Sequence, residues 1–361
     1  MRAFPKIDNF IFSEKGMYFT DVNYNCFGLV KKGFGITDKC FSFDGESMKK
    51  PYLFSDLVSV DDCIYAVPLS ASHMYKIKAD CENMEAFRIS YSKVSDDAVC
   101  NRVKFMSAHV YDKKIYMMPA LYPAIVVYDT QSGLMSYIDD WVDSIENIGR
   151  ENERAYFRRT RLIGDVIYAP LCRTNRVLKY FIKEDRWELA VVSEGDQGYS
   201  DICFDGTDFW LSSRMGNYVT CWNEQTGQCR KIDGVWSDST YFSQIEYYDG
   251  KVWVLPKEGN NIGVVRDESI SAFLSIQANK LYSMRLFEDS MYVSADSGCV
   301  YEIQGKDVNM HFVRFDQGLI DLKEYAYSDI YTYFSGSRSE NLFSENVDNS
   351  LEMLIEAIIQ N

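Results

Sequence analysis

The chain has 361 residues, of which 47% are hydrophobic, 15% aromatic and 25% charged, the composition of an ordinary globular protein. Its formal net charge of −15 would repel a phosphate backbone or an anionic membrane over most of the surface. We therefore expect no nucleic-acid partner and no membrane partner.

The N-terminal residues show no apolar segment typical of a signal peptide, and no apolar run has the roughly 18 residues that predict a membrane span. Ten cysteines are spread along the chain without a C-x-x-C pair. Several of them, such as Cys63 and Cys299, stand in apolar strand patterns that favour buried free thiols. The sequence predicts a cytoplasmic protein with reduced cysteines.

The dominant pattern is an apolar residue followed by Tyr or Trp, which occurs seven times at steps of 39 to 52 residues. The seven aromatic members, called the anchors below, are Tyr18, Tyr65, Tyr116, Tyr168, Trp210, Trp253 and Tyr292. Each anchor follows a polar turn and lies in a short apolar run. A period near 45 residues is typical of repeat architectures, and with strand-like units it predicts a β-propeller.

Each unit contains short strand-like segments separated by turns, and the fifth unit shows them most plainly. Its four predicted strands are residues 200–204, 209–212, 218–222 and 228–232. Four such antiparallel strands make one propeller blade. In chain order, we expect blades near residues 8–45, 53–92, 103–140, 158–193, 199–234, 242–275 and 282–317.

The sequence thus predicts an all-β, seven-bladed β-propeller of four-stranded antiparallel blades over residues 1–318. Six blades is the alternative if the first unit is irregular. The closure of the ring stays open. The first unit has four strands of its own, so the ring closes by packing alone, or a further strand comes from residues 325–334.

Two segments interrupt the period. Residues 141–156 lengthen the link between the third and fourth blades, and we expect a solvated connector there, with a short helix or lid as the alternative. Residues 319–361 form a C-terminal extension, in which the apolar spacing of Leu351–Ile359 predicts an amphipathic helix near 350–360. Asn349 and Glu352 supply a capping box. We expect this helix to dock on the propeller rim, with partner binding as the alternative.

Two local patterns resemble those of kelch and WD40-like β-propellers. One is the hairpin from Tyr248 to Trp253, in which a turn precedes the anchor, and the other is the Tyr-Asp-x-x-x-Gly turn from Tyr128 to Gly133. The resemblance covers about residues 8–318 and implies the architecture alone. The double glycine of kelch repeats and the Trp-Asp ending of WD40 repeats are missing, so no family ligand or active site is carried over.

Counting back from the anchors separates two faces of each innermost strand. Residues eight and six positions before the anchor are apolar or Tyr in twelve of fourteen cases, which predicts a packed face. Nine positions before the anchor stand Asn9, Asp56, Ser107, Arg159, Asp201, Gln244 and Ser283. Seven positions before it stand Ile11, Val58, His109, Arg161, Cys203, Glu246 and Arg285. We expect these two sets to line the central channel.

Arginines gather on the fourth and fifth units of this acidic chain. Guanidinium groups bind carboxylates and phosphates through paired hydrogen bonds, and a tyrosine there would stack on a ring. The predicted ligand-binding residues at the channel mouth are His109, Tyr122, Arg159, Arg161, Arg173, Asp201, Arg214, Glu246 and Arg285. The alternative is structural: the channel is wet, and the arginines pair with Asp201 and Glu246.

No catalytic residue, metal site or cofactor is predicted. The chain has three histidines and shows no H-E-x-x-H motif, no Cys/His cluster, no G-x-S-x-G elbow and no phosphate-binding glycine-rich loop. His109 with Glu246 or Asp201 would form an acid–base pair, but a lone histidine on a strand more often has a structural role.

The leading hypothesis is a cytoplasmic, non-enzymatic binding or scaffold protein. It would recognise a partner protein, a peptide or a polar anionic ligand on the face at the channel mouth. The alternative is a lyase or hydrolase with its active site there, because propellers host both kinds of function. A third hypothesis is a subunit of a larger assembly that docks through the C-terminal helix.

Overall fold

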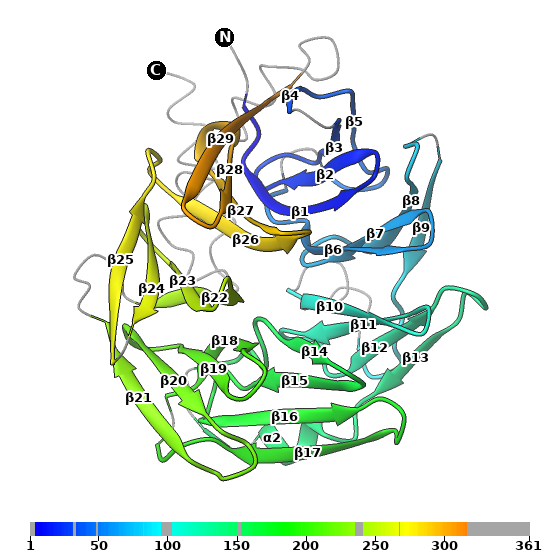
Figure 1. Ribbon diagram of the computed structural model, residues 1–361. Coiled ribbons are helices and arrows are strands. Elements are labelled where there is room, and N and C mark those ends of the chain that lie inside the picture. Colours follow the sequence, from blue (N-terminus) through cyan, green and yellow to red (C-terminus); the bar gives the residue numbers. More distant parts are fainter. Residues whose placement is uncertain are drawn as a thin grey trace, which may run out of the picture.

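The computed structural model describes residues 4–31, 34–47, 50–81, 83–94, 103–146, 148–149, 153–195, 197–234, 241–266 and 268–315. These residues form seven antiparallel sheets arranged as a ring around a common axis (Figure 1). The expectation of seven four-stranded blades is therefore confirmed, and the six-bladed alternative is wrong.

Each of the first three blades is a meander whose first strand lies nearest the axis (Figure 1). Blade one contains β1 (Ile7–Ser13), β2 (Gly16–Asp21), β3 (Phe27–Val30) and β5 (Lys39–Phe41). Blade two contains β6 (Phe54–Val60), β7 (Cys63–Pro68), β8 (His73–Lys78) and β9 (Met84–Arg88). Blade three contains β10 (Phe105–Tyr111), β11 (Lys114–Pro119), β12 (Ile125–Asp129) and β13 (Met135–Ile138).

The remaining four blades repeat the same order. Blade four contains β14 (Arg161–Ile163), β15 (Val166–Pro170), β16 (Arg176–Phe181) and β17 (Arg186–Val191). Blade five contains β18 (Tyr199–Phe204), β19 (Phe209–Ser213), β20 (Tyr218–Trp222) and β21 (Cys229–Asp233). Blade six contains β22 (Phe242–Tyr248), β23 (Lys251–Pro256), β24 (Asn261–Arg266) and β25 (Ser269–Ser275). Blade seven contains β26 (Leu281–Phe287), β27 (Ser290–Ala295), the short 3-10 helix η1 (Asp296–Gly298), β28 (Cys299–Gln304) and β29 (Asp307–Arg314).

Tight turns join the first and second strands of the blades, as the sequence predicts. In blade six, Asp249 and Gly250 both have positive φ, 50° and 69°. This is the type I′ pattern, whose twist matches that of the flanking strands. The anchors follow on the second strand of every blade. Six of them are buried and Tyr168 is half-buried, so their role is structural.

The hydrophobic core is divided among the seven junctions between neighbouring blades. Seven buried clusters are present, and each one combines residues of two adjacent sheets. For example, Tyr65 of blade two packs against Tyr128 of blade three, with ring centroids 5.9 Å apart. Because every sheet is covered on both faces by its neighbours, closure of the ring is needed to bury the first and last sheets.

The connector between blades three and four is packed against the core. It contains α2 (Val142–Glu146), and Trp141 and Ile145 are buried in the cluster between these two blades. The indole Nε1 of Trp141 donates a hydrogen bond to the carbonyl oxygen of Ile138 at 2.9 Å. The expectation of a solvated connector is thus wrong, because the apolar residues of this segment fill the junction, and the short helix of the alternative is present.

The ring is closed by pairing between the first and last blades, through a short strand that was not predicted from the sequence. The short strand β4 (Gly35–Ile36) leaves blade one and pairs in parallel with the end of β29 in blade seven. Thr37 N also donates to the carbonyl oxygen of Arg314 at 2.8 Å. Residues 325–334 and the C-terminal extension with its predicted helix lie outside the described residues.

Nine cysteines lie in the described ranges, and all nine are free thiols. Burial raises the pKa of several of them, including Cys203, so these thiols are protonated near neutral pH. Within the same ranges, no helix is both long and apolar enough to span a membrane.

Candidate functional site: a cationic pocket at the channel mouth

In six of the seven blades, the innermost strand contains one extra residue at the tenth position before its anchor. In β6, Phe54 and Asp56 both have cross-strand partners in β7, whereas Ser55 between them has none. The register shifts by one residue at the same place in five other blades. In blade four an offset of one residue lies between Phe157, which bridges Leu171, and Arg161, which pairs with Tyr168. Such β-bulges redirect side chains at the ends of strands. The residues ten positions before the anchors, called the bulge residues below, are Asp8, Ser55, Met106, Arg158, Ser200, Ser243 and Tyr282.

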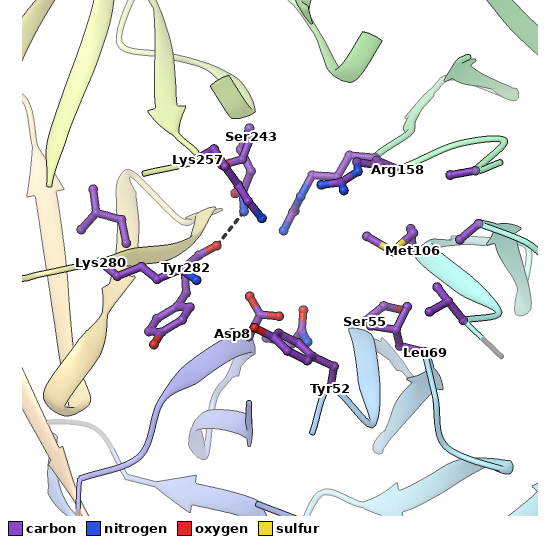
Figure 2. Close-up of a pocket in the computed structure, with 17 residues that line it drawn as sticks. Asp8, Tyr52, Ser55, Leu69, Met106, Arg158, Ser243, Lys257, Lys280 and Tyr282 are labelled. Carbon is purple, nitrogen blue, oxygen red and sulfur yellow. Dashed lines mark hydrogen bonds between the residues drawn. The ribbon is translucent and has the colours of Figure 1, made fainter. Parts of the chain in front are cut away.

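Six of these seven bulge residues line a cavity of about 180 Å³ at the mouth of the channel, called the mouth pocket below (Figure 2). Its basic residues are Arg158, Arg159, Lys257 and Lys280, and its acidic residue is Asp8. Its apolar residues are Leu69, Val103, Met106, Ala120, Ala155 and Leu281. Its other polar residues are Asn9, Tyr52, Ser55, Ser243, Gln244 and Tyr282. Among the described residues, four cations thus face one carboxyl group, in a chain whose net charge is −15.

The basic side chains come from three blades and converge. Arg158 and Lys257 point toward one another across one side of the pocket (Figure 2). Burial lowers the pKa of Lys257, and the nearby charges of Arg158 and Lys280 lower it further. Lys280 lies with its Nζ 5.4 Å from the centre of the Tyr282 ring. Within the part of the chain that the structure describes, neither lysine forms an ion pair with a carboxylate.

Arg158 and Arg214 both contact Tyr241. The guanidinium Nη1 donates to the Tyr241 hydroxyl at 3.4 Å, and the Arg214 guanidinium lies 5.0 Å from the centre of the same ring. Burial of Tyr241 opposes its ionisation, yet Arg158, Lys257 and Arg214 together hold the pKa of the phenol below its ordinary value. The cationic field therefore extends from the pocket into blade six.

Asp8 and Tyr52 form the side of the pocket opposite these cations (Figure 2). Burial raises the pKa of Asp8, although the charges of Arg159, Lys280, Lys257 and Arg285 act in the opposite direction.

The backbone of Tyr52 is in the left-handed region, with φ 52°, which is uncommon for a bulky residue. Two hydrogen bonds hold this conformation: Tyr52 N donates to Val22 O at 2.7 Å, and Ser70 Oγ donates to Tyr52 O at 2.9 Å. A strained, fixed aromatic residue at a pocket wall is a feature typical of ligand sites.

The polar residues nine positions before the anchors serve mainly to join neighbouring blades. Asp201 is 2% exposed, and its Oδ2 accepts a hydrogen bond from Ile245 N of the next blade at 3.0 Å. Asn9 donates to the carbonyl oxygen of Phe54 at 2.9 Å, and Gln244 accepts from the next blade's backbone at 2.7 Å. Asp56, Asp201 and Gln244 all accept from the backbone N of the residue eight positions before the anchor of the next blade. Asn9, Arg159 and Gln244, members of the same set, line the mouth pocket.

Deeper in the channel the predicted arginines are paired. Arg161 Nη2 donates to Glu246 Oε2 at 3.0 Å, and Arg285 forms an ion pair with Asp56. Glu246 raises the pKa of Arg161 further above its ordinary range despite the opposing effect of burial. The structural alternative stated from the sequence named Asp201 and Glu246 as partners of the arginines. Arg161 does pair with Glu246, whereas the partner of Arg285 is Asp56.

His109 is bonded to a hydroxyl rather than to a carboxylate. Its Nε2 lies 2.6 Å from Thr160 Oγ1, which is in turn 2.8 Å from Ser107 Oγ. Burial lowers the pKa of His109 to about 4, so the ring is neutral at physiological pH. No hydrogen bond joins it to Glu246 or Asp201 in the described ranges.

The other predicted site residues lie away from the mouth pocket. Tyr122 is buried between blades two and three, 5.1 Å from the ring centre of Phe105. Arg214 Nε donates to Glu153 Oε2 at 3.0 Å, and Arg173 follows β15 without lining the pocket. Of the nine residues predicted from the sequence, the pocket contains Arg159 alone.

No protein-family model and no curated protein matches this sequence. Solved structures do resemble the fold. A catalytically inactive variant of virginiamycin B lyase from Staphylococcus aureus with quinupristin matches at a TM-score of 0.64 and 11% identity, over 83% of this chain and 96% of the lyase. YCF48 bound to D1 peptide matches at 0.52 and 11%, over 72% and 81%. The computationally designed protein Ika8 matches at 0.56 and 10%, over 86% and 88%.

At identities this low, the likeness concerns the fold alone. By its own strand order and by these likenesses, the chain is a seven-bladed β-propeller, and the comparisons place it in no particular family.

Proposed function

We propose that this propeller is a cytoplasmic binding protein that holds a small anionic ligand in the mouth pocket. The observation that carries the proposal is the gathering of Arg158, Arg159, Lys257 and Lys280 around one cavity, where Asp8 supplies the single carboxyl group among the described lining residues. A cleft lined by charges of one sign focuses the field and attracts counter-ions, all the more when its walls exclude water.

The contrast with the rest of the chain strengthens this reading. Elsewhere in the described residues, arginines such as Arg161 and Arg214 are satisfied by carboxylates of the protein itself. At the mouth the cations remain in excess, which costs free energy in a folded protein unless an anion or water compensates them. Similar propellers are known with quinupristin or a peptide in their structures, which supports a ligand-binding role for the fold.

A direct test is isothermal titration calorimetry with inorganic phosphate, acetate and benzoate. We expect at least one of these anions to bind, and Arg158→Gln and Lys257→Gln each to weaken that binding about tenfold, since each removes one charged hydrogen-bond donor. The matched control is Arg186→Gln on the outer strand of blade four, where the guanidinium is paired with Glu184 and Glu188. Absence of binding by all three anions, or equal loss in the control, contradicts the proposal.

The lyase or hydrolase alternative lacks a specific observation in its favour. His109, the proposed base, is bonded to the hydroxyl of Thr160 rather than to a carboxylate, and burial lowers its pKa to about 4, which makes it a weak base. The third hypothesis, docking through the C-terminal helix, concerns residues outside those described.

A further inference from the structure

The mouth pocket is polar along one side and apolar along another. In Figure 2, Arg158 and Lys257 lie along one side, and Met106 and Leu69 lie along an adjoining side, across the cavity from Lys280 and Tyr282. Val103 and Ala120 also contribute to the lining. An anion that used only the cations would leave Met106 and Leu69 facing water.

The apolar side is built from elements that fix its position. Met106 is the bulge residue of β10, and Leu69 follows directly after β7. Leu69 N donates to the carbonyl oxygen of Leu53 at 2.8 Å, so its backbone is held. Ala120, 1% exposed, also lines the pocket, and its small side chain takes up little of the space available to a ligand.

The volume limits what can fill the pocket. A dry apolar cavity of about 150 Å³ accommodates benzene. At about 180 Å³, the mouth pocket has room for one ring or a branched chain of similar size and one small charged group. A larger molecule would leave most of its body outside the cavity.

We infer that the ligand is a compact amphipathic carboxylate about the size of benzoate, with its charged end between Arg158 and Lys257 and its apolar end against Met106 and Leu69. This inference rests on the proposed anion-binding function and adds the chemical class of the ligand. The strained Tyr52 and Asp8 lie side by side in the pocket wall (Figure 2), where the Asp8 carboxylate can accept a hydrogen bond from a ligand hydroxyl or amino group.

The experiment compares four probes at constant ionic strength by calorimetry: acetate, benzoate, 1-naphthoate and benzyl alcohol. We expect benzoate to bind about tenfold or more tightly than acetate, because the ring buries apolar surface. Benzyl alcohol should bind at least about tenfold more weakly than benzoate, because it has no charge for the cations. Naphthoate should gain nothing over benzoate, because its second ring exceeds the cavity.

Two variants test whether the preference for benzoate over acetate depends on the apolar side of the pocket. Met106→Ser should lower the ratio of benzoate to acetate affinity about fivefold. Leu69→Ser should act in the same direction and serves as the second variant if Met106→Ser lowers the melting temperature. Leu134→Ser is the matched control, because Leu134 is 69% exposed on the outer edge of blade three.

The results of these titrations distinguish the proposal of an anion site from the assignment of its ligand to the compact amphipathic carboxylates. Equal affinities for acetate and benzoate, both lost in Arg158→Gln, would overturn the amphipathic class while leaving the anion site standing. Benzyl alcohol binding as tightly as benzoate would overturn both. A further gain for naphthoate would overturn the size assignment.

Discussion

The mouth pocket and the middle of the channel use the same residue types in opposite balance. In the middle, Arg161 and Arg285 are each paired with a carboxylate of another blade, Glu246 and Asp56. At the mouth, the lining residues that the structure describes include four cations and one carboxyl group, that of Asp8. Polarity along a propeller channel therefore does not by itself indicate a ligand site. Unbalanced charge in a cavity is the more informative signal.

The largest effect on stability is expected at the level between these two regions, where Asp201 joins blades five and six. Its carboxylate accepts backbone hydrogen bonds from Ile202 N at 2.7 Å and Ile245 N at 3.0 Å. Asp201→Ala leaves both buried donors without a partner, so the free energy of unfolding should fall by about 3 kcal/mol. Urea denaturation followed by tryptophan fluorescence measures this change.

Two further variants control that experiment. Asp201→Asn keeps one acceptor oxygen, and because burial raises the pKa of Asp201 to about 6, it also removes a carboxylate that is costly to ionise. It should therefore lose clearly less stability than Asp201→Ala. Glu14→Ala, at an exposed hairpin turn, should change stability by no more than about 0.5 kcal/mol. A full loss in Asp201→Asn would show that packing, rather than hydrogen bonding, sets the cost.

A smaller effect is expected for the paired charges of the middle channel. A double-mutant cycle with Arg161→Ala and Glu246→Ala should give a coupling free energy of about 1 kcal/mol, because both side chains are partly exposed. Anion affinity at the mouth should change by less than about twofold, since the pair is internally neutral. Loss of anion binding in Arg161→Ala alone would contradict the distinction between a neutral middle channel and an anion-binding mouth pocket.

The smallest expected effect concerns the pH dependence of anion binding. Asp8 is the one acidic residue in the described lining of the mouth pocket, and burial raises the pKa at which its negative charge is lost. Affinity for an anion should therefore rise as the pH falls through that raised pKa, by about threefold. Benzenesulfonate is the suitable probe, because its own charge is constant in this range.

Asp8→Asn should bind the sulfonate more tightly at neutral pH and lose most of the dependence at acidic pH. The groups facing Asp8 are Arg159, Lys257, Lys280 and Arg285, all cationic in this range. Measurements should stay below neutral pH, because the lowered pKa of Lys257 would remove a cation at alkaline pH. An unchanged pH profile in Asp8→Asn would assign the titration to another group.

The fold was largely predictable because each blade repeats a local pattern. Anchors such as Trp253 and turns such as Asp249-Gly250 lie where the sequence places them. The mouth pocket was mostly not predictable. The bulge adds a residue at the same position in six units, and blade four has an offset of the same size, so an alignment on the anchors contains no gap that would reveal it. Strict alternation therefore pointed to Asp201 and missed Asp8.

The sequence by itself determined the ring of seven blades and the packed faces between them, because burial periodicity and turn chemistry act over a few neighbouring residues. The tertiary structure alone decided which charges meet. Arg161 reaches Glu246 across 85 positions of the chain, and Arg285 reaches Asp56 across 229. The cations left over at the mouth could be identified only after such distant pairs had formed, since an uncompensated charge is a property of the folded surroundings and not of the residue.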